Sequence, residues 1–231
     1  MVKATFLGHA CWVIREGERE VLIDPFLTGN PQAAATAETQ NPTAILVSHA
    51  HNDHVGDAAA IARRSGAVLV SNFEIASYFE SLGLNAHGMH LGGAHTFDWG
   101  WVKLTLAFHG STLWIEEEQR AVTLGNPCGF LLRMGGKTIY HAGDTALFGD
   151  MALLGRRHPI DLALLPIGDN YTMGIDDAVE AVRLLQPAVV VPMHYNTFPP
   201  IVQDPEEFAR KVRAETSARP VVVPPGQSVE L

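Results

Sequence analysis

The sequence predicts an α/β protein built as a four-layer αβ/βα sandwich, with two sheets between outer layers of helices. Apolar, β-prone runs such as Ala44–Val47 and Asp161–Pro166 alternate with segments of helical character along the chain. A strand-rich first half is followed by a second half that repeats the pattern, and no linker or shift of composition separates them. We therefore expect one domain over residues 1–231, with a site in the cleft between the sheets.

The composition fits a compact protein that contains a metal site. Hydrophobic residues make up 47% of the 231 residues, and the formal net charge is −9 at pH 7. Because no basic run exceeds two residues, we expect a small-molecule substrate and no nucleic-acid partner. The eleven histidines are the compositional outlier, and imidazole is a common metal ligand.

The sequence also indicates where in the cell the protein is located. The N-terminus lacks the basic start and sustained apolar core of a signal peptide, and no stretch approaches the ~18 apolar residues of a membrane helix. Two cysteines, Cys11 and Cys128, do not make a disulfide framework. We expect a cytoplasmic protein without a membrane partner, and a homo-oligomer is compatible with the sequence.

The first half begins with a meander of three strands, in which apolar runs are separated by Gly8-His9 and by a polar turn. Asp24 follows the third strand and precedes a proline. The segment from Phe26 to Pro42, whose middle suits a short helix, is a candidate lid or substrate wall. We expect strands at Val2–Leu7, Cys11–Arg15, Glu20–Ile23, Ala44–Val47 and Ala67–Ser71, and helices at Asp57–Arg64 and Phe73–Leu82.

A cluster of metal-binding residue types, His49-Ala50-His51-Asn52-Asp53-His54, follows the strand Ala44–Val47 after one residue, Ser48. Residues two apart in an extended segment point to the same side, so His49 and His51 can present two imidazoles to one ion. The helix that follows turns Asp53 and His54 toward a second, adjacent position. This ligand set suits Zn²⁺ and also Mn²⁺, Fe or Ni²⁺. A polar surface loop is the alternative.

Three strand ends in the second half carry further residues of this kind. His109 follows an alternating strand, Asp144 follows a hairpin, and His194 follows an apolar strand. A carboxylate can place one oxygen on each of two cations, which gives Asp144 a bridging capacity. We expect the strands Trp101–Phe108, Cys128–Arg133, Lys137–His141, Asp161–Pro166 and Ala188–Pro192.

The rest of the second half is less specific. Asn170, Tyr171 and Thr172 follow a strand and either contact substrate or form an ordinary entry to the next helix. The segment from Ser111 to Asn126 is expected to be a loop beside the site, and His141 a core residue. We expect helices at Ile175–Leu185 and Pro205–Glu215, and strands at Val221–Val223 and Ser228–Leu231 that close the second sheet.

The motif His49-x-His51-x-Asp53-His54 resembles the signature of the metallo-β-lactamase-fold hydrolases, and the later histidine, aspartate and histidine follow in the order of that superfamily. The run Asp-Pro-Phe-Leu-Thr-Gly-Asn-Pro from Asp24 to Pro31 resembles the uncharacterised metal-dependent hydrolases related to L-ascorbate-6-phosphate lactonase. The resemblance covers essentially the whole chain and implies the same four-layer sandwich. Within the His-x-His-x-Asp-His motif, Ala50 and Asn52 replace the small or glycine residues often seen at these positions. The replacement affects the conformation of the loop.

The resemblance implies a role for each candidate residue. One metal ion would bind His49, His51 and His109, and a second would bind Asp53, His54 and His194, with Asp144 shared. His9 would be an active-site histidine, although a buried hydrogen-bonded histidine is an alternative. Asp24 would accept the free N–H of a metal-bound histidine, although an ordinary turn residue is equally compatible.

The resemblance further implies a hydrolase that uses a metal-bridging hydroxide on a small ester, lactone or phosphodiester, with Asp53 as a proton shuttle. Its cofactors would be two divalent metal ions, zinc first and manganese, nickel or iron as alternatives. Two other functions stay open at this point. One is an iron-dependent sulfur or redox enzyme on the same fold, and the other is a non-catalytic metal-binding paralogue.

Overall fold

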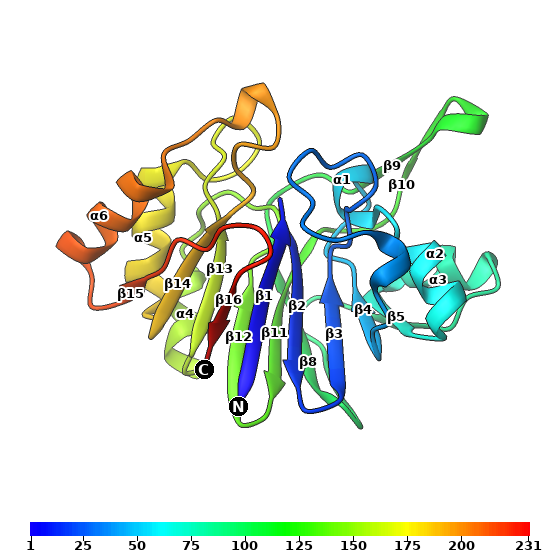
Figure 1. Ribbon diagram of the computed structural model, residues 1–231, viewed down its shortest axis with the longest axis horizontal. Helices are drawn as coiled ribbons and strands as arrows, with labels where there is room; N and C mark the ends of the chain where they lie inside the picture. The colour runs from blue at the N-terminus through cyan, green and yellow to red at the C-terminus, as the bar shows by residue number, and fades with distance from the viewer.

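Two seven-stranded sheets face each other in the computed structural model, which describes all of residues 1–231 (Figure 1). The strand order of the first sheet is β16-β1-β2-β3-β4-β5-β6, and that of the second is β15-β14-β13-β12-β11-β8-β7. The strands of the first sheet are β1 (Val2–Gly8), β2 (Cys11–Glu16), β3 (Arg19–Ile23), β4 (Ala44–Leu46), β5 (Val68–Asn72), β6 (Ala86–Met89) and β16 (Ser228–Glu230). Those of the second sheet are β7 (Ala94–Phe97), β8 (Gly100–Leu106), β11 (Cys128–Met134), β12 (Lys137–His141), β13 (Leu162–Pro166), β14 (Val189–Met193) and β15 (Arg219–Pro220).

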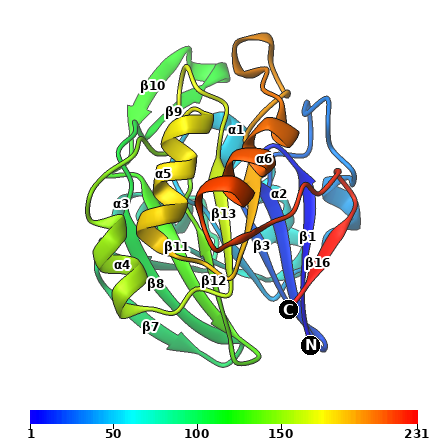
Figure 2. The ribbon, with the colours of Figure 1, turned by 90° about the vertical axis from the view of Figure 1, so that its left-hand side faces the viewer.

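Helices cover the outer face of each sheet. The pair α2 (Ala58–Ser65) and α3 (Phe73–Ser81) packs on the first sheet. The second sheet is covered by α4 (Met151–Arg157), α5 (Ile175–Leu185) and α6 (Pro205–Glu215), which face the viewer in Figure 2. The predicted four-layer sandwich is thereby confirmed. No helix is both long and apolar enough to cross a membrane.

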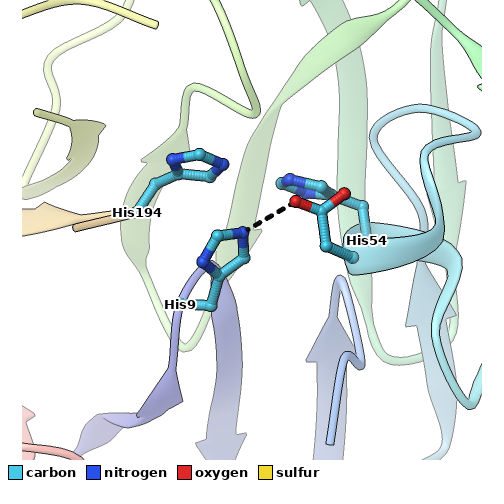
Figure 3. Close-up of side chains that lie close together, drawn as sticks. His9, His54 and His194 are labelled. Carbon is cyan, nitrogen blue, oxygen red and sulfur yellow. Dashed lines mark hydrogen bonds and ion pairs between the residues drawn. The ribbon is translucent and has the colours of Figure 1, made fainter. Parts of the chain in front are cut away.

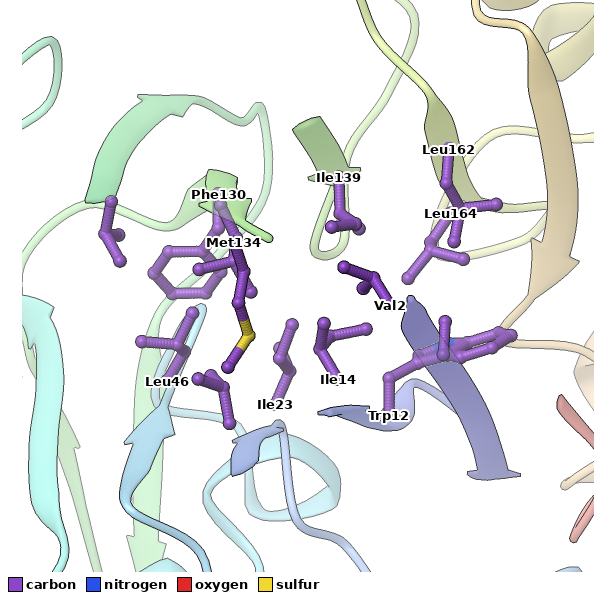
Figure 4. Close-up of a cluster of buried hydrophobic side chains, with 14 of the residues drawn as sticks. Val2, Trp12, Ile14, Ile23, Leu46, Phe130, Met134, Ile139, Leu162 and Leu164 are labelled. Carbon is purple, nitrogen blue, oxygen red and sulfur yellow. The ribbon is translucent and has the colours of Figure 1, made fainter. Parts of the chain in front are cut away.

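The core lies in three layers that follow from the alternation of side chains along each strand. On β2, Trp12 and Ile14 join an inner cluster of 27 buried residues, whereas Cys11 and Val13 join the cluster beneath α2 and α3. Side chains from both sheets meet in the inner cluster, where Ile23 of the first sheet lies near Met134 of the second (Figure 4). Because both faces of these strands are buried, their sequences read as nearly continuous apolar runs.

The topology brings the strand ends that carry polar residues to one edge of the sandwich. The strands β3, β4 and β5 are parallel, and so are β12, β13 and β14. Their carboxyl ends, together with the ends of β1 and β8, lie at the upper edge in Figure 1, beside the short helix α1 (Asn52–Val55). The loops at this edge can therefore carry the residues of a site, while the two sheets hold the loops in place.

The structure corrects three expectations about the fold. The predicted loop between Ser111 and Asn126 contains a projecting hairpin, β9 (Thr112–Ile115) and β10 (Arg120–Thr123), joined by the 3-10 helix η2 (Glu116–Glu118). The C-terminal strand β16 pairs with β1 in the first sheet, so the prediction that it closes the second sheet is wrong. The second sheet ends instead on β15, which begins two residues before the strand expected at Val221–Val223.

Other elements differ in length or were not anticipated. The strands β6 and β7 and the helix α4 had no sequence prediction. Within the long segment after β3, only a 3-10 helix, η1 (Ala37–Thr39), forms, and a further one, η3 (Pro199–Ile201), follows β14. The predicted core residue His141 is fully buried, and its Nε2 lies 2.9 Å from the carbonyl oxygen of Ala10.

Candidate metal centre

The seven side chains expected from the sequence to bind metal meet at the strand-end edge of the sandwich. They come from the loop after β4 and from α1, and from the segments that follow β8, β12 and β14. The seven are His49, His51, Asp53, His54, His109, Asp144 and His194.

The first group contains three imidazoles, those of His49, His51 and His109, whose ligand nitrogens lie within 4.8 Å of one another. The Nε2 of His49 and the Nδ1 of His51 are 3.0 Å apart, because residues two apart in this loop present their rings to the same side. The three rings are arranged edge to face. Three nitrogens converging on one point are a ligand set typical of zinc sites.

The second group contains Asp53, His54 and His194, with His9 as a fourth member that the sequence did not assign to a metal. The short helix α1 begins after His51 and carries Asp53 and His54. The His54 ring also lies close to the first group, with its centroid 4.1 Å from that of His49. His194 follows β14 on the opposite sheet, so the group bridges the two halves of the fold.

Asp144 lies between the two groups. Its Oδ2 atom is 3.0 Å from Nε2 of His194, 3.3 Å from Nε2 of His54 and 3.5 Å from Nε2 of His109. The Nε2 atom of His49 is 4.0 Å away. The single oxygen Oδ2 thus lies close to imidazoles of both groups, whereas the sequence-based prediction placed one oxygen on each ion.

Gly143 allows this close approach. Its φ is +61°, and a Cβ at this position would lie 2.6 Å from the carbonyl oxygen of Cys128 and 3.1 Å from Cβ of Ser48. A side chain would therefore collide with both neighbours, and only glycine lets the end of β12 pass so near the histidine loop. The site therefore requires a glycine directly before Asp144.

The residues present fit metal ions, as their unpaired polar atoms indicate. Buried polar groups in proteins are almost always hydrogen-bonded. Here Oδ1 of Asp144 and Nδ1 of His194 are buried without any hydrogen-bond partner, and Nε2 of His54 and of His194 lie near Oδ2 of Asp144 without forming a hydrogen bond. Unpaired lone pairs of this chemistry, gathered at one place, are what divalent cations bind.

Asp24 supports the site from beneath. It is fully buried, its Oδ1 accepts the backbone N–H of Ser48 at 2.7 Å, and its Oδ2 accepts the Ser48 hydroxyl at 2.6 Å. The same Oδ2 lies 2.8 Å from Nδ1 of His54, which leaves Nε2 of that ring directed toward Asp144. Asp24 therefore fixes both the start of the histidine loop and the tautomer of His54.

His9 supports the site from the end of β1. Its ring is fully buried, with Nδ1 2.8 Å from Oγ1 of Thr197 and Nε2 3.2 Å from Oδ2 of Asp53. Figure 3 shows the rings of His9, His54 and His194 close together, with the dashed line marking the bond to the Asp53 carboxylate. The sequence did not identify Thr197, although its place three residues after His194 is a signal that was present.

Several of these residues lie in an uncommon backbone conformation. The φ values of His9, Asp24 and His194 are +58°, +45° and +56°. Histidine and aspartate visit this left-handed region more readily than most residues, but the conformation persists only where the surroundings hold it. Hydrogen bonds hold it here, because the backbone N–H of His194 donates to the carbonyl oxygen of His9 at 2.7 Å.

Burial and charge set the protonation of the site. Burial and the nearby charge of His54 hold the pKa of His49 well below its usual range, which keeps a lone pair free for a metal. Burial disfavours the charged form of Asp144, but His194 and His54 outweigh it and hold the pKa of that carboxyl well below its usual value. Burial of His54 is likewise outweighed, by Asp144 and Asp24, so the pKa of that ring is raised.

A cavity of about 220 Å³ opens onto the centre. His51 and His109 are only partly buried at its floor, and Tyr171 and Phe198 stand at its walls. Of the three substrate candidates Tyr171 lines this cavity, whereas Asn170 and Thr172 do not. The Thr172 hydroxyl instead donates to the carbonyl oxygen of Met173 at 3.3 Å. A larger cavity, about 420 Å³, lies beside α4 and contains none of the candidate ligands.

Removing bound metal is expected to destabilise the protein. A ligand that binds only the folded state at a thousandfold excess over its Kd contributes about 4 kcal/mol, or roughly 8–16 °C in Tm for a chain of this size. Thermal unfolding before and after dialysis against a chelator measures the effect, and added zinc should restore the original Tm. An unchanged Tm on chelation, in protein shown to have lost its metal, would contradict the assignment of these side chains as ligands.

Comparison with known proteins agrees with the fold and with metal dependence. The profile of the Beta-lactamase superfamily domain matches residues 3–194. The chain is 55% identical to a UPF0173 metal-dependent hydrolase of Pelotomaculum thermopropionicum and 50% identical to one of Bacillus cereus, with full coverage of both chains in each case. It is also similar to the solved structure of Igni18, a novel metallo hydrolase from Ignicoccus hospitalis. That match has 39% identity and a TM-score of 0.90, and it covers 99% of this chain and 97% of the other.

These matches confirm the family resemblance and the fold class predicted from the sequence. The family profile includes every strand end that carries a candidate ligand, from Gly8-His9 to His194. The chain therefore belongs to the beta-lactamase superfamily and, within it, to the UPF0173 metal-dependent hydrolases.

Proposed function

We propose that this protein is a dinuclear metal-dependent hydrolase of a small ester, lactone or phosphodiester. The observation that carries the proposal is the meeting of two donor groups at Oδ2 of Asp144, at the floor of a cavity that opens to solvent. One ion would bind His49, His51 and His109, the other Asp53, His54 and His194, and Asp144 would contact both. When bound, the ions supply an acidified water as nucleophile and polarise the oxygen of the attacked group.

The protein's own residues prepare the site for this chemistry. Asp24 and Ser48 hold the histidine loop, so the ligand nitrogens keep their positions as substrate enters. Asp53 is partly exposed and lines the cavity, and its Oδ2 accepts a hydrogen bond from His9 while keeping a second lone pair for the ion. Its other oxygen, Oδ1, is the atom we assign to receive a proton from the attacking water and to pass it to the leaving group.

His9 is a positioning residue in this scheme. It is fully buried and does not line the cavity, so it acts through Asp53 and does not contact substrate. Burial, the nearby His194 charge and that of His54 lower its pKa to about 4, in spite of the Asp53 carboxylate. A neutral ring at neutral pH can donate from Nε2 to Asp53 while its Nδ1 accepts the Thr197 hydroxyl proton.

We expect His9→Ala to lower kcat about 10- to 100-fold, the usual cost of losing a partner of a metal ligand. Thr197→Val, which removes only the hydroxyl that fixes the His9 tautomer, should cause a smaller fall in the same direction. Steady-state kinetics and metal content on the same samples measure both effects. Wild-type kcat and metal content in His9→Ala would show that the contact with Asp53 has no role.

The proposed function is tested with a panel of chromogenic esters, lactones and phosphodiesters, each assayed with the metal-loaded and the metal-free protein. We expect turnover of at least one class by the loaded protein and none after chelation. Protein that holds about two ions per chain and hydrolyses nothing in the panel would overturn the proposal.

A further inference from the structure

The face of the protein that carries the centre lacks free positive charge. The loops at the strand ends comprise residues 8–10, 24–43, 48–57, 107–111, 142–150, 167–174 and 193–203. None of the 16 lysines and arginines of the chain falls in these loops. An anionic group of a substrate, outside the reacting centre itself, would therefore find no cationic side chain there.

Cationic side chains of other elements border these loops only outside the cavity. Lys3 and Arg15 lie beside Thr39 and Gln40, and Lys103 and Arg157 lie beside Phe148 and Asp150. Arg64 of α2 donates from Nη2 to the carbonyl oxygen of Ala37 at 2.8 Å. Arg120 of the projecting hairpin forms an ion pair with Glu118, with Nη2 and Oε2 2.7 Å apart. No lysine or arginine lines the cavity over the centre.

The walls of the cavity are aromatic. Tyr171 is 55% exposed at the rim, and Phe198 lies opposite the histidine loop as a second wall. The Phe198 ring is fixed by two neighbours, since its centroid is 5.6 Å from that of His9 and 6.3 Å from that of Phe26. Aromatic walls bury apolar surface and stack on flat groups, so they favour uncharged substituents.

The charge of the protein also disfavours an anionic substrate. The two carboxylates that line the cavity, Asp53 and Asp144, and a net charge of −9 give this face an unfavourable potential for anions. A neutral substrate meets no such barrier. The ions at the centre would be the only positive charges offered, and they would be engaged by the reacting group.

From the cation-free loops, the aromatic walls and the small cavity we infer that the substrate is a neutral carboxylic ester or lactone with an apolar or aromatic substituent. This inference rests on the proposed function and names its substrate class. In the reaction the water oxygen bonds to the acyl carbon as the bond from that carbon to the alcohol oxygen breaks. The alcohol oxygen takes one proton of the water, and the acid releases the other when it ionises, so no oxidant or further reactant is needed.

The test compares neutral with anionic substrates, and its first two substrates differ mainly by one carboxylate. The metal-loaded protein is assayed with 4-nitrophenyl butyrate, with the 4-nitrophenyl monoester of succinate, with an aromatic-substituted γ-lactone and with bis(4-nitrophenyl) phosphate. We expect kcat/KM for the butyrate to exceed that for the succinate monoester by at least about tenfold, because the carboxylate has no partner. Lactone turnover should exceed that of the phosphodiester.

Variants of Tyr171 locate the effect in the cavity. We expect Tyr171→Ala to raise KM for the neutral substrates about three- to tenfold with little change in kcat, as for the loss of a binding contact that is equal in ground and transition states. Phe73→Ala is the matched control, because Phe73 on α3 is 54% exposed and lies outside the cavity. Tyr171→Arg should shift selectivity toward the succinate monoester by roughly fivefold.

The outcomes separate this inference from the proposed function. Hydrolysis of the phosphodiester without hydrolysis of the neutral ester or lactone, or a preference for the succinate monoester, would overturn the inference and leave the hydrolase standing. An unchanged KM in Tyr171→Ala would equally remove the assigned binding wall. Loaded protein that turns over none of the four substrates would count against the hydrolase itself.

Discussion

Replacing Asp144 by alanine is expected to lower turnover by about 10²- to 10³-fold, the scale on which enzymes lose rate when a group that organises charge at the reaction centre is removed. Its Oδ2 faces imidazoles of both donor groups, at 3.0 Å from His194 and 3.5 Å from His109. Without this carboxylate neither ion of the proposed pair would have its shared ligand, and four imidazoles would remain without an anion between them. Metal content should therefore fall together with activity.

The measurement is elemental analysis and steady-state kinetics on one preparation of Asp144→Ala. Asp150→Asn is a suitable control, because Asp150 is an exposed carboxylate near the same loop whose side chain makes no capping hydrogen bond. We expect the control to match the wild type in both readouts. Full metal content and activity in Asp144→Ala would rule out a bridging role for this residue.

The second large effect is expected at Asp24, and it combines stability with metal affinity. Its carboxylate is fully buried and accepts from Ser48 N–H, from Ser48 O–H and from Nδ1 of His54. Asp24→Ala leaves three buried donors without an acceptor, so we expect a loss of about 3–5 kcal/mol, or roughly 6–20 °C in Tm. Metal affinity should fall about 10- to 100-fold, because His54 loses the partner that orients it.

A second substitution separates the charge of Asp24 from its backbone conformation. Asparagine tolerates the left-handed backbone, and the φ of Asp24 is +45°. Asp24→Asn therefore keeps the fold of the turn, but it presents an amide N–H₂ in place of one acceptor oxygen. Thermal unfolding of the metal-free forms and titration with zinc measure both variants. Wild-type stability and affinity in both would reduce Asp24 to an ordinary turn residue.

The sequence was sufficient to predict those parts of the fold and the site that are encoded locally. The alternation in β2 and the apolar runs of β13 and β14 predicted buried strands, and the polar residue after each strand predicted the edge where the site forms. His49, His51 and His54 share one short loop, so their spacing alone indicated two adjacent positions.

What the sequence could not reveal depends on contacts between distant segments. The bond between His9 and Thr197 joins residues 188 positions apart, and nothing in either segment specifies the other. The same holds for β16, a three-residue strand whose sequence suits the edge of either sheet and which pairs with β1 through Ala4 and Val229. The hairpin β9–β10 lacks a recognisable turn pair, because the acidic run Glu116–Glu118 occupies its tip.

The position of Tyr171 illustrates a finer limit. The sequence predicted a possible substrate contact for Asn170, Tyr171 and Thr172 without distinguishing among them. Asp169 and Asn170 both adopt positive φ, at +60° and +21°, and the turn they form leaves Tyr171 lining the cavity. Which of three adjacent residues meets the site is thus set by the backbone of the turn, and periodicity carries no information about it.

The measurement that tests the central claim most directly is the metal content of protein purified without added metal, with hydrolysis of the ester, lactone and phosphodiester panel assayed on the same sample. Two donor groups that share Asp144 predict about two ions of zinc, manganese or nickel per chain, with turnover that is lost on chelation. Iron without hydrolytic turnover, or a protein that binds no metal and hydrolyses nothing, would contradict the account.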